Sequence, residues 1–274
     1  MITADLHLHT RFSDGTFTTE ELADRALKAG LGAIALTDHD TVQGCTEMKT
    51  LCADRGIEFI PGTELTAECN GSEVHVLGYW LDLESEKLTR ELAHFQSVRH
   101  DRIHEMVRKL NHAGIPLLAS QVFAIANCQS PGRPHVARAL VEHGMVGDYD
   151  SAFDRFLKKG RPAWVPKARM DVAKAVELIH DAGGAAVLAH PGLYKNDDLI
   201  PRAAGAGIDG LECWHTKHSA SVSENYLRYA AEYRLVATGG SDCHGMAKGT
   251  PLIGTLRIPY TQVERLKACC RTSR

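Results

Sequence analysis

The chain has 274 residues, 44% of them hydrophobic, which is enough for one α/β barrel or two smaller domains with an ordinary core. Its formal net charge of -3 argues against a protein that coats nucleic acid with positive charge, so any such contact must be local. The eight cysteines contain no C-x-x-C pair, and no segment has the pattern of a membrane-spanning helix or a signal peptide, so we expect a cytoplasmic protein with reduced thiols.

The first predicted strand, in ADLHLHT, alternates apolar residues with Asp5, His7 and His9. Residues two apart on a strand share a face, so these three polar side chains are expected to point the same way. An H-x-H pair alone is a weak sign of a metal site, because two surface histidines can alternate by accident.

Six later segments are short apolar runs that end in polar residues. They are AIALTDHD (33–40), IEFIPGTELT (57–66), EVHVLGYW (73–80), GAAVLAHPG (184–192), GIDGLECWH (207–215) and RLVATGGSDCHG (234–245). Each is expected to form a buried strand with its chemistry at the carboxyl end. Amphipathic helices are predicted between them; the helix at 18–30 opens with a capping box from Thr18 to Glu21. This alternation predicts right-handed βαβ units and a largely parallel sheet.

The alternation of strands and helices stops between about residue 81 and residue 166. A long helix through Leu92 and Leu110 is followed by helical sequence interrupted by glycine and proline, with no convincing strand. We therefore predict a barrel formed by residues 1–80 and 166–274, and a mainly helical insertion, residues 81–165, that contributes to substrate binding.

Almost every predicted strand ends in a candidate metal ligand. The candidates are His7, His9, Asp14, His39, Glu64, His75, His190, Asp242 and His244. Imidazole and carboxylate together suit Zn, Mn or Fe. Singly, His75 could be a core histidine and His190 a strand-ending residue before Pro191, but their joint occurrence at strand ends favours a metal site. Nine groups exceed the needs of one ion, which favours two or three metals with a carboxylate such as Glu64 between them.

These motifs carry a family resemblance. DLHLHT, the Asp14 of SDG, TDHD, PGTE, VHVLGY, AHPG and SDCH, in this order, resemble the polymerase and histidinol phosphatase (PHP) superfamily. The resemblance implies a distorted (β/α)7 barrel and a trinuclear centre of divalent transition metals that hydrolyses phosphoesters, with Mn²⁺ expected and Zn²⁺ or Fe²⁺ as alternatives. It implies three ligand sets: His7, His9, Glu64 and Asp242; Glu64, His75 and His190; and Asp14, His39 and His244. Asp5 and Asp40 are expected to lie behind the ligands.

The insertion contains a candidate anion site. SPGRPHVARALVEHG places Arg133 and His135 at the predicted start of a helix, where free N–H groups, the helix dipole and a guanidinium attract phosphate, and Lys167 could add a second cation. Taken singly, Arg133 and Lys167 could equally be surface charges. GRPHVARALV followed by FDRFLKKGRPAWVPK resembles the PHP subgroup that acts on nucleoside 3′,5′-bisphosphates and on the 5′ ends of short RNA.

The resulting prediction is a phosphoric monoester hydrolase that removes the 3′-phosphate of nucleoside 3′,5′-bisphosphates, such as adenosine 3′,5′-bisphosphate, and that has short 5′-phosphorylated RNA as a further candidate substrate. His215, or a water on the metals, would protonate the leaving oxygen. No membrane contact and no obligatory protein partner are expected. Two alternatives stay open: another PHP phosphatase, such as one for histidinol phosphate, and a non-catalytic regulatory module.

Overall fold

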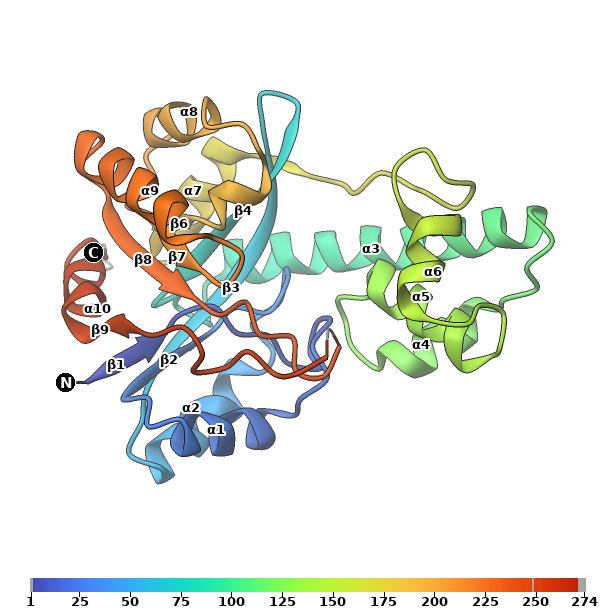
Figure 1. The fold of residues 1–274 in the computed structure, drawn as a ribbon, viewed down its shortest axis with the longest axis horizontal. Coiled ribbons are helices and arrows are strands. Elements are labelled where there is room, and N and C mark those ends of the chain that lie inside the picture. The colour runs from blue at the N-terminus through green and yellow to red at the C-terminus, as the bar shows by residue number, and fades with distance from the viewer. Residues whose placement is uncertain (1, 248, 271–274) are drawn as a thin grey trace.

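The computed structural model describes residues 2–247 and 249–270, and within these ranges the strands form one sheet beside a helical insertion (Figure 1). The order of the sheet is β8-β7-β6-β4-β3-β2-β1-β9, with β5 paired to β3. The strands are β1 (Thr3–Asp5), β2 (Ala33–Leu36), β3 (Glu58–Cys69), β4 (Ser72–Tyr79), β5 (Met170–Asp171), β6 (Ala185–Leu188), β7 (Gly210–His215), β8 (Val236–Gly240) and β9 (Ile258–Pro259).

The sheet curls into a nearly closed barrel, because β8 approaches β1 across the remaining gap. The Leu6 N–H donates to the Gly239 carbonyl oxygen over 3.3 Å. A Cβ added at Gly240 would lie 2.3 Å from the Cβ of His7, so only glycine allows the two segments to come this close. The predicted α/β barrel is confirmed.

The expectation of a parallel sheet holds for β1-β2-β3 and for β6-β7-β8, but it is wrong for β4. This strand runs antiparallel to both β3 and β6. It forms a hairpin with β3 through a two-residue turn at Asn70 and Gly71, which have φ angles of 51° and 76°. The dipeptide Asn-Gly between two strand-like runs is a strong hairpin signal, because both residues tolerate positive φ.

Helices cover the outside of the barrel. They are α1 (Thr19–Lys28), α2 (Cys45–Asp54), α7 (Val172–Asp181), α8 (Leu199–Gly205), α9 (Ala220–Glu232) and α10 (Tyr260–Lys267). The predicted capping box of α1 is confirmed, since Thr18 accepts from the Glu21 N–H and Glu21 accepts from the Thr18 N–H. Apolar side chains such as Leu6, Leu77 and Val187 fill one end of the barrel, which leaves the carboxyl ends of the strands for polar groups.

The insertion consists of α3 (Glu86–His112), α4 (Ala119–Ala126), α5 (Arg133–Glu142), α6 (Tyr149–Ala152) and a π-helical turn at Phe153–Leu157. Leu88, Leu92 and Phe95 of α3 pack in the apolar layer between the sheet and α7, whereas its later residues pack in a separate apolar cluster with α4 and α5. The long helix α3 therefore joins the two parts. The predicted boundaries at 80/81 and 165/166 stay a prediction, and their outer limits at residues 1 and 271–274 lie outside the described residues. In the part of the chain that the structure describes, no helix combines the length and apolarity needed to cross a membrane.

Candidate metal centre

The structure gathers all nine predicted ligands at the end of the barrel where the parallel strands have their carboxyl ends; His75 reaches it from the first half of the antiparallel strand β4. Each of them lies in a group of donor atoms that are within 4.8 Å of one another: His7, His9, Asp14, His39, Glu64, His75, His190, Asp242 and His244. The first strand explains part of this convergence, because both histidines that follow β1 are fully buried and lie near the loop after β8. The alternating pattern in the sequence therefore places two imidazoles on the inner wall of the barrel mouth.

Glu64 lies at the centre of the cluster, and its two carboxylate oxygens face different partners. Oε1 lies 2.7 Å from His75 Nδ1 and 3.0 Å from His190 Nε2. Oε2 lies 3.3 Å from the Nε2 atoms of both His7 and His9. Burial opposes ionisation of Glu64, but the surrounding imidazoles hold its pKa well below the usual value. The carboxylate is therefore ionised and can serve two ions at once.

In the first group of donors, the distances between imidazole nitrogens and carboxylate oxygens are those expected for ligands of a shared metal ion. His7 Nε2 and His9 Nε2 lie 3.5 and 3.2 Å from Asp242 Oδ1, in addition to their 3.3 Å distances from Glu64 Oε2. Ligands bound at about 2.0–2.2 Å around one tetrahedral ion are about 3.3–3.6 Å apart. His7, His9 and Asp242 form one compact group of donor atoms, and Glu64 borders it through Oε2.

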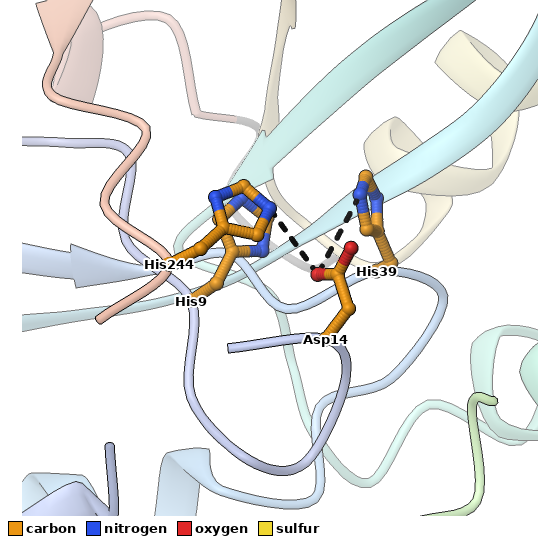
Figure 2. Close-up of side chains that lie close together, drawn as sticks. All are labelled: His9, Asp14, His39 and His244. Carbon is orange, nitrogen blue, oxygen red and sulfur yellow. Dashed lines mark ion pairs between the residues drawn. The ribbon is translucent and has the colours of Figure 1, made fainter. Parts of the chain in front are cut away.

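Another group of candidate ligands surrounds Asp14, which comes from the loop after β1 (Figure 2). Its Oδ1 lies 3.2 Å from His244 Nε2 and 4.0 Å from His39 Nε2. The rings of His9 and His244 stack with their centroids 4.2 Å apart, which joins this group to the first one. The His244 Nδ1 faces the Asp242 carbonyl oxygen at 2.9 Å and would donate to it, while Nε2 faces Asp14.

Unpartnered polar atoms inside the cluster indicate that cations belong there. Among the described residues, six buried atoms of the predicted ligands have no hydrogen-bond partner: His7 Nε2, His9 Nδ1, His9 Nε2, Asp14 Oδ1, His39 Nδ1 and His190 Nδ1. An unsatisfied buried polar atom lowers the stability of a fold by about 1–3 kcal/mol. Six such atoms in one place would therefore strongly destabilise the protein if nothing bound them. Divalent cations with imidazole and carboxylate ligands would satisfy several of these atoms together, among them His7 Nε2, His9 Nε2 and Asp14 Oδ1.

Asp5 and Asp40 lie behind the cluster and hold its loops. Asp5 is fully buried and accepts hydrogen bonds from the Ser241 and Gly254 N–H groups at 2.8 and 3.3 Å, and burial raises its pKa to about 6. Asp40 follows His39 and accepts from the Arg99 Nε at 2.9 Å. The first aspartate thus anchors the loop that carries Asp242, and the second anchors the loop that carries His39.

His215 lies below Asp242 and is only 1% exposed. Its Nδ1 accepts from the Lys217 N–H at 3.1 Å, so the proton of the neutral ring is on Nε2, which faces Asp242 Oδ2 at 3.4 Å. In this geometry the ring orients a candidate ligand, and it does not line the cavity described below. Its assignment as a proton donor to the leaving group stays a prediction.

A cavity of about 240 Å³ lies between the metal cluster and the insertion. On the barrel side it is lined by Asp14, His39, Glu64, His75, His190, Asp242 and His244. The insertion side contributes Arg99, Ser130, Gly132, Arg133 and Phe153, and the segment that leads back into the barrel contributes Lys167. The guanidinium carbon of Arg133 lies 6.0 Å from the centre of the Phe153 ring, which supports the arginine from behind. One wall of the cavity therefore consists of candidate metal ligands and the other is cationic.

His135 does not belong to this cationic wall. It is buried, it is absent from the cavity lining, and burial lowers its pKa to about 4, so it is neutral near pH 7. Its Nδ1 accepts the Gly132 N–H at 3.0 Å, and its own N–H donates to the Gly132 carbonyl. Because Pro134 has no N–H, the start of α5 has few free donors left for an anion. An anion at the start of α5 would therefore be contacted mainly by the Arg133 side chain.

Sequence reasoning missed three charged residues at the site. Arg99 lines the cavity and pairs with Asp40; Glu73 lines it as well and lies 3.0 Å from Lys167 Nζ, so the charge of that lysine is partly neutralised. Glu212 is fully buried in β7 and lies 2.9 Å from His7 Nδ1; burial opposes its ionisation, but His7 keeps its pKa below the usual value. A glutamate inside the apolar run GLECWH was a signal that could have identified this last residue.

Comparisons with known proteins support these observations. The model of the PHP domain family matches residues 5–182. The chain is 35% identical to a 5′-3′ exoribonuclease of Haemophilus influenzae over 245 residues, 88% of this chain and 89% of the relative. It is 34% identical to a 3′,5′-nucleoside bisphosphate phosphatase of Chromobacterium violaceum, covering 93% and 91% of the two chains. A crystal structure from Bifidobacterium adolescentis, described as a metal-dependent phosphoesterase, superposes with a TM-score of 0.90 at 31% identity over 98% of this chain and 96% of the other.

Proposed function

Because the chain belongs to the PHP domain family, we propose that it is a metal-dependent phosphomonoesterase that removes the 3′-phosphate of nucleoside 3′,5′-bisphosphates. The observation that carries the proposal is the cavity with two different walls, a cluster of metal-binding side chains and a group of cations. A substrate with two phosphates can occupy both walls at once. A relative that is 34% identical is named for this activity.

The proposed ligand sets are the three that the family resemblance implies, and short distances between donor atoms within the sets support them. His7, His9, Glu64 and Asp242 would hold the first ion, and Glu64, His75 and His190 the second. Asp14, His39 and His244 would hold a third. Mn²⁺ fits this mixture of imidazole and carboxylate, and Zn²⁺ and Fe²⁺ share the preference. When bound, such ions lower the pKa of water and neutralise charge on the phosphoryl oxygens.

The protein's own cations would hold the phosphate that is not cleaved. Arg133 faces the cavity with Phe153 behind it, and Arg99 and Lys167 lie on the same side. Ser130 adds a buried hydroxyl that has no hydrogen-bond partner among the described residues. A phosphate held by these groups would orient the second phosphate toward Glu64. The reacting phosphate would then be held in a fixed position instead of having to reach it by diffusion.

Replacing the Arg133 side chain tests whether the cations bind the phosphate that is not cleaved. Arg133→Ala is expected to raise KM for adenosine 3′,5′-bisphosphate by roughly ten- to a hundredfold, since a hydrogen bond to a charged group contributes about 1.5–3 kcal/mol. KM for p-nitrophenyl phosphate, which has a single phosphate, should change little. Arg161→Ala provides the control, because this arginine is exposed and does not line the cavity. Equal losses on both substrates would show that Arg133 serves the fold or the chemistry rather than recognition.

A second candidate substrate is short RNA with a 5′-phosphate, because another relative is named a 5′-3′ exoribonuclease. The same cavity would hold its terminal nucleotide. A phosphate-release screen with added Mn²⁺ separates the alternatives: nucleoside 3′,5′-bisphosphates, histidinol phosphate and short 5′-phosphorylated RNA. We expect the highest kcat/KM with a bisphosphate. Fastest turnover of histidinol phosphate would overturn the proposed substrate, and no turnover of any compound would favour a regulatory module.

A further inference from the structure

Glu212 is the buried carboxylate closest to the metal cluster that none of the three ligand sets uses. It is fully buried on β7, where the chain passes beneath the barrel mouth. Burying a carboxylate is unfavourable unless it is paired and hydrogen-bonded. Among the described residues, the Glu212 side chain meets this requirement through two of the histidines at the site, which links its presence to the candidate metal centre rather than to the apolar core.

The first contact sets the orientation of His7. Glu212 Oε1 lies 2.9 Å from His7 Nδ1, while His7 Nε2 points to Glu64 Oε2 at 3.3 Å and Asp242 Oδ1 at 3.5 Å. A carboxylate can only accept, so Nδ1 carries a proton, and Nε2 is the ring atom that would bind a metal together with the other ligands. This is the tautomer that a metal ligand requires.

The second contact holds the backbone of His190. Glu212 Oε2 accepts the His190 N–H at 2.7 Å. His190 has a φ of 26°, a conformation that is unfavourable for a residue with a side chain and that persists only when neighbouring groups hold it. In this conformation its Nε2 lies 3.0 Å from Glu64 Oε1. One carboxylate thus positions a ligand of the first set and a ligand of the second.

We propose that Glu212 is a positioning residue that couples the first two metal sites, by holding His7 in its metal-binding tautomer and His190 in its metal-binding backbone conformation. The inference rests on the proposed metal centre. It predicts that loss of the Glu212 charge weakens metal binding at both sites together, because the two oxygens of the same carboxylate accept the two hydrogen bonds. It does not depend on which phosphoester the protein cleaves.

The test is Glu212→Gln, which keeps the volume but offers one acceptor oxygen where two donors need one each. Mn²⁺ affinity, measured by competition with a chelator, is expected to fall about 10–100-fold, as is usual when a group that orients a metal ligand is lost. The stabilisation that Mn²⁺ adds to the Tm should shrink as well. Glu212→Asp keeps the charge, so its Mn²⁺ affinity should lie between those of the wild-type protein and the Glu212→Gln variant. If the Gln variant does not fold, the Asp variant tests the positioning role.

Asp209→Asn is the matched control on the same pair of strands. Asp209 Oδ2 lies 2.7 Å from His180 Nε2 and accepts the Ala186 N–H at 2.7 Å. Like Glu212, it therefore contacts one imidazole and one backbone N–H, but it does so near the opposite ends of β6 and β7. Its loss should lower stability and leave Mn²⁺ affinity within about twofold of wild type, since it touches no ligand.

The outcomes separate this inference from the proposed function. Wild-type metal affinity in both Glu212 variants would overturn the positioning role while leaving the metal centre intact. Equal losses in the Glu212 and Asp209 variants would overturn it too, because the effect would then come from general stability. If the wild-type protein took up no divalent metal, the proposed function itself would fail, and this inference with it.

Discussion

Glu64→Gln is expected to lower kcat by about a hundred- to thousandfold, at a saturating concentration of Mn²⁺, while the protein stays folded. The reason is the position of the carboxylate between two groups of histidines, with Oε1 facing His75 and His190 and Oε2 facing His7 and His9. Glutamine has the same shape but only one neutral acceptor oxygen, so it cannot serve two cations. Metal content should therefore fall together with turnover.

Elemental analysis of the purified proteins provides the second measurement. The wild-type chain is expected to hold more than one equivalent of transition metal, and the Glu64→Gln variant fewer. Glu177→Gln is the control, since this glutamate is exposed and pairs only with Lys87 among the described contacts. Unaltered turnover of the Glu64 variant, or full wild-type activity with no more than one metal per chain, would contradict the bridging position.

The second large effect comes from the substrate. Adenosine 3′-monophosphate is expected to have a kcat/KM about a hundredfold below that of the 3′,5′-bisphosphate, because binding energy at the remote phosphate orients the reacting one. Arg133 and the other cations of the insertion wall would lose their anion, while the cluster around Glu64 would be unchanged. Steady-state phosphate release measures both rates. Equal kcat/KM values would remove the proposed role of the insertion wall.

Much of the candidate site could be predicted from local sequence, because each candidate ligand lies in or shortly after a strand-like segment. The alternation of Asp5, His7 and His9 and the polar ends of the apolar runs both indicate which side chains share the barrel mouth. Such patterns depend on neighbours within a few residues. They were sufficient to indicate a group of nine candidate ligands that the fold does bring together.

Other features depend on contacts between distant segments, which no local pattern contains. Arg99 reaches Asp40 from 59 residues away, and Glu212 reaches His7 from 205 residues away. His135 was placed correctly at the start of a helix, but whether its ring faces the cavity or caps the backbone depends on the packing of α5. The reversed direction of β4 is different in kind, because the Asn-Gly turn that causes it was present in the sequence.

The identity of the product tests the central claim most directly. Adenosine 3′,5′-bisphosphate, incubated with the Mn²⁺-loaded protein, should yield 5′-AMP and inorganic phosphate, which chromatography separates from 3′-AMP. Only the phosphate against the histidine and carboxylate wall should be lost, since the opposite wall consists of cations that bind without cleaving. A chelator should abolish the reaction and Mn²⁺ should restore it. Formation of 3′-AMP as the main product, or release of phosphate that a chelator does not affect, would contradict the assignment of the two walls.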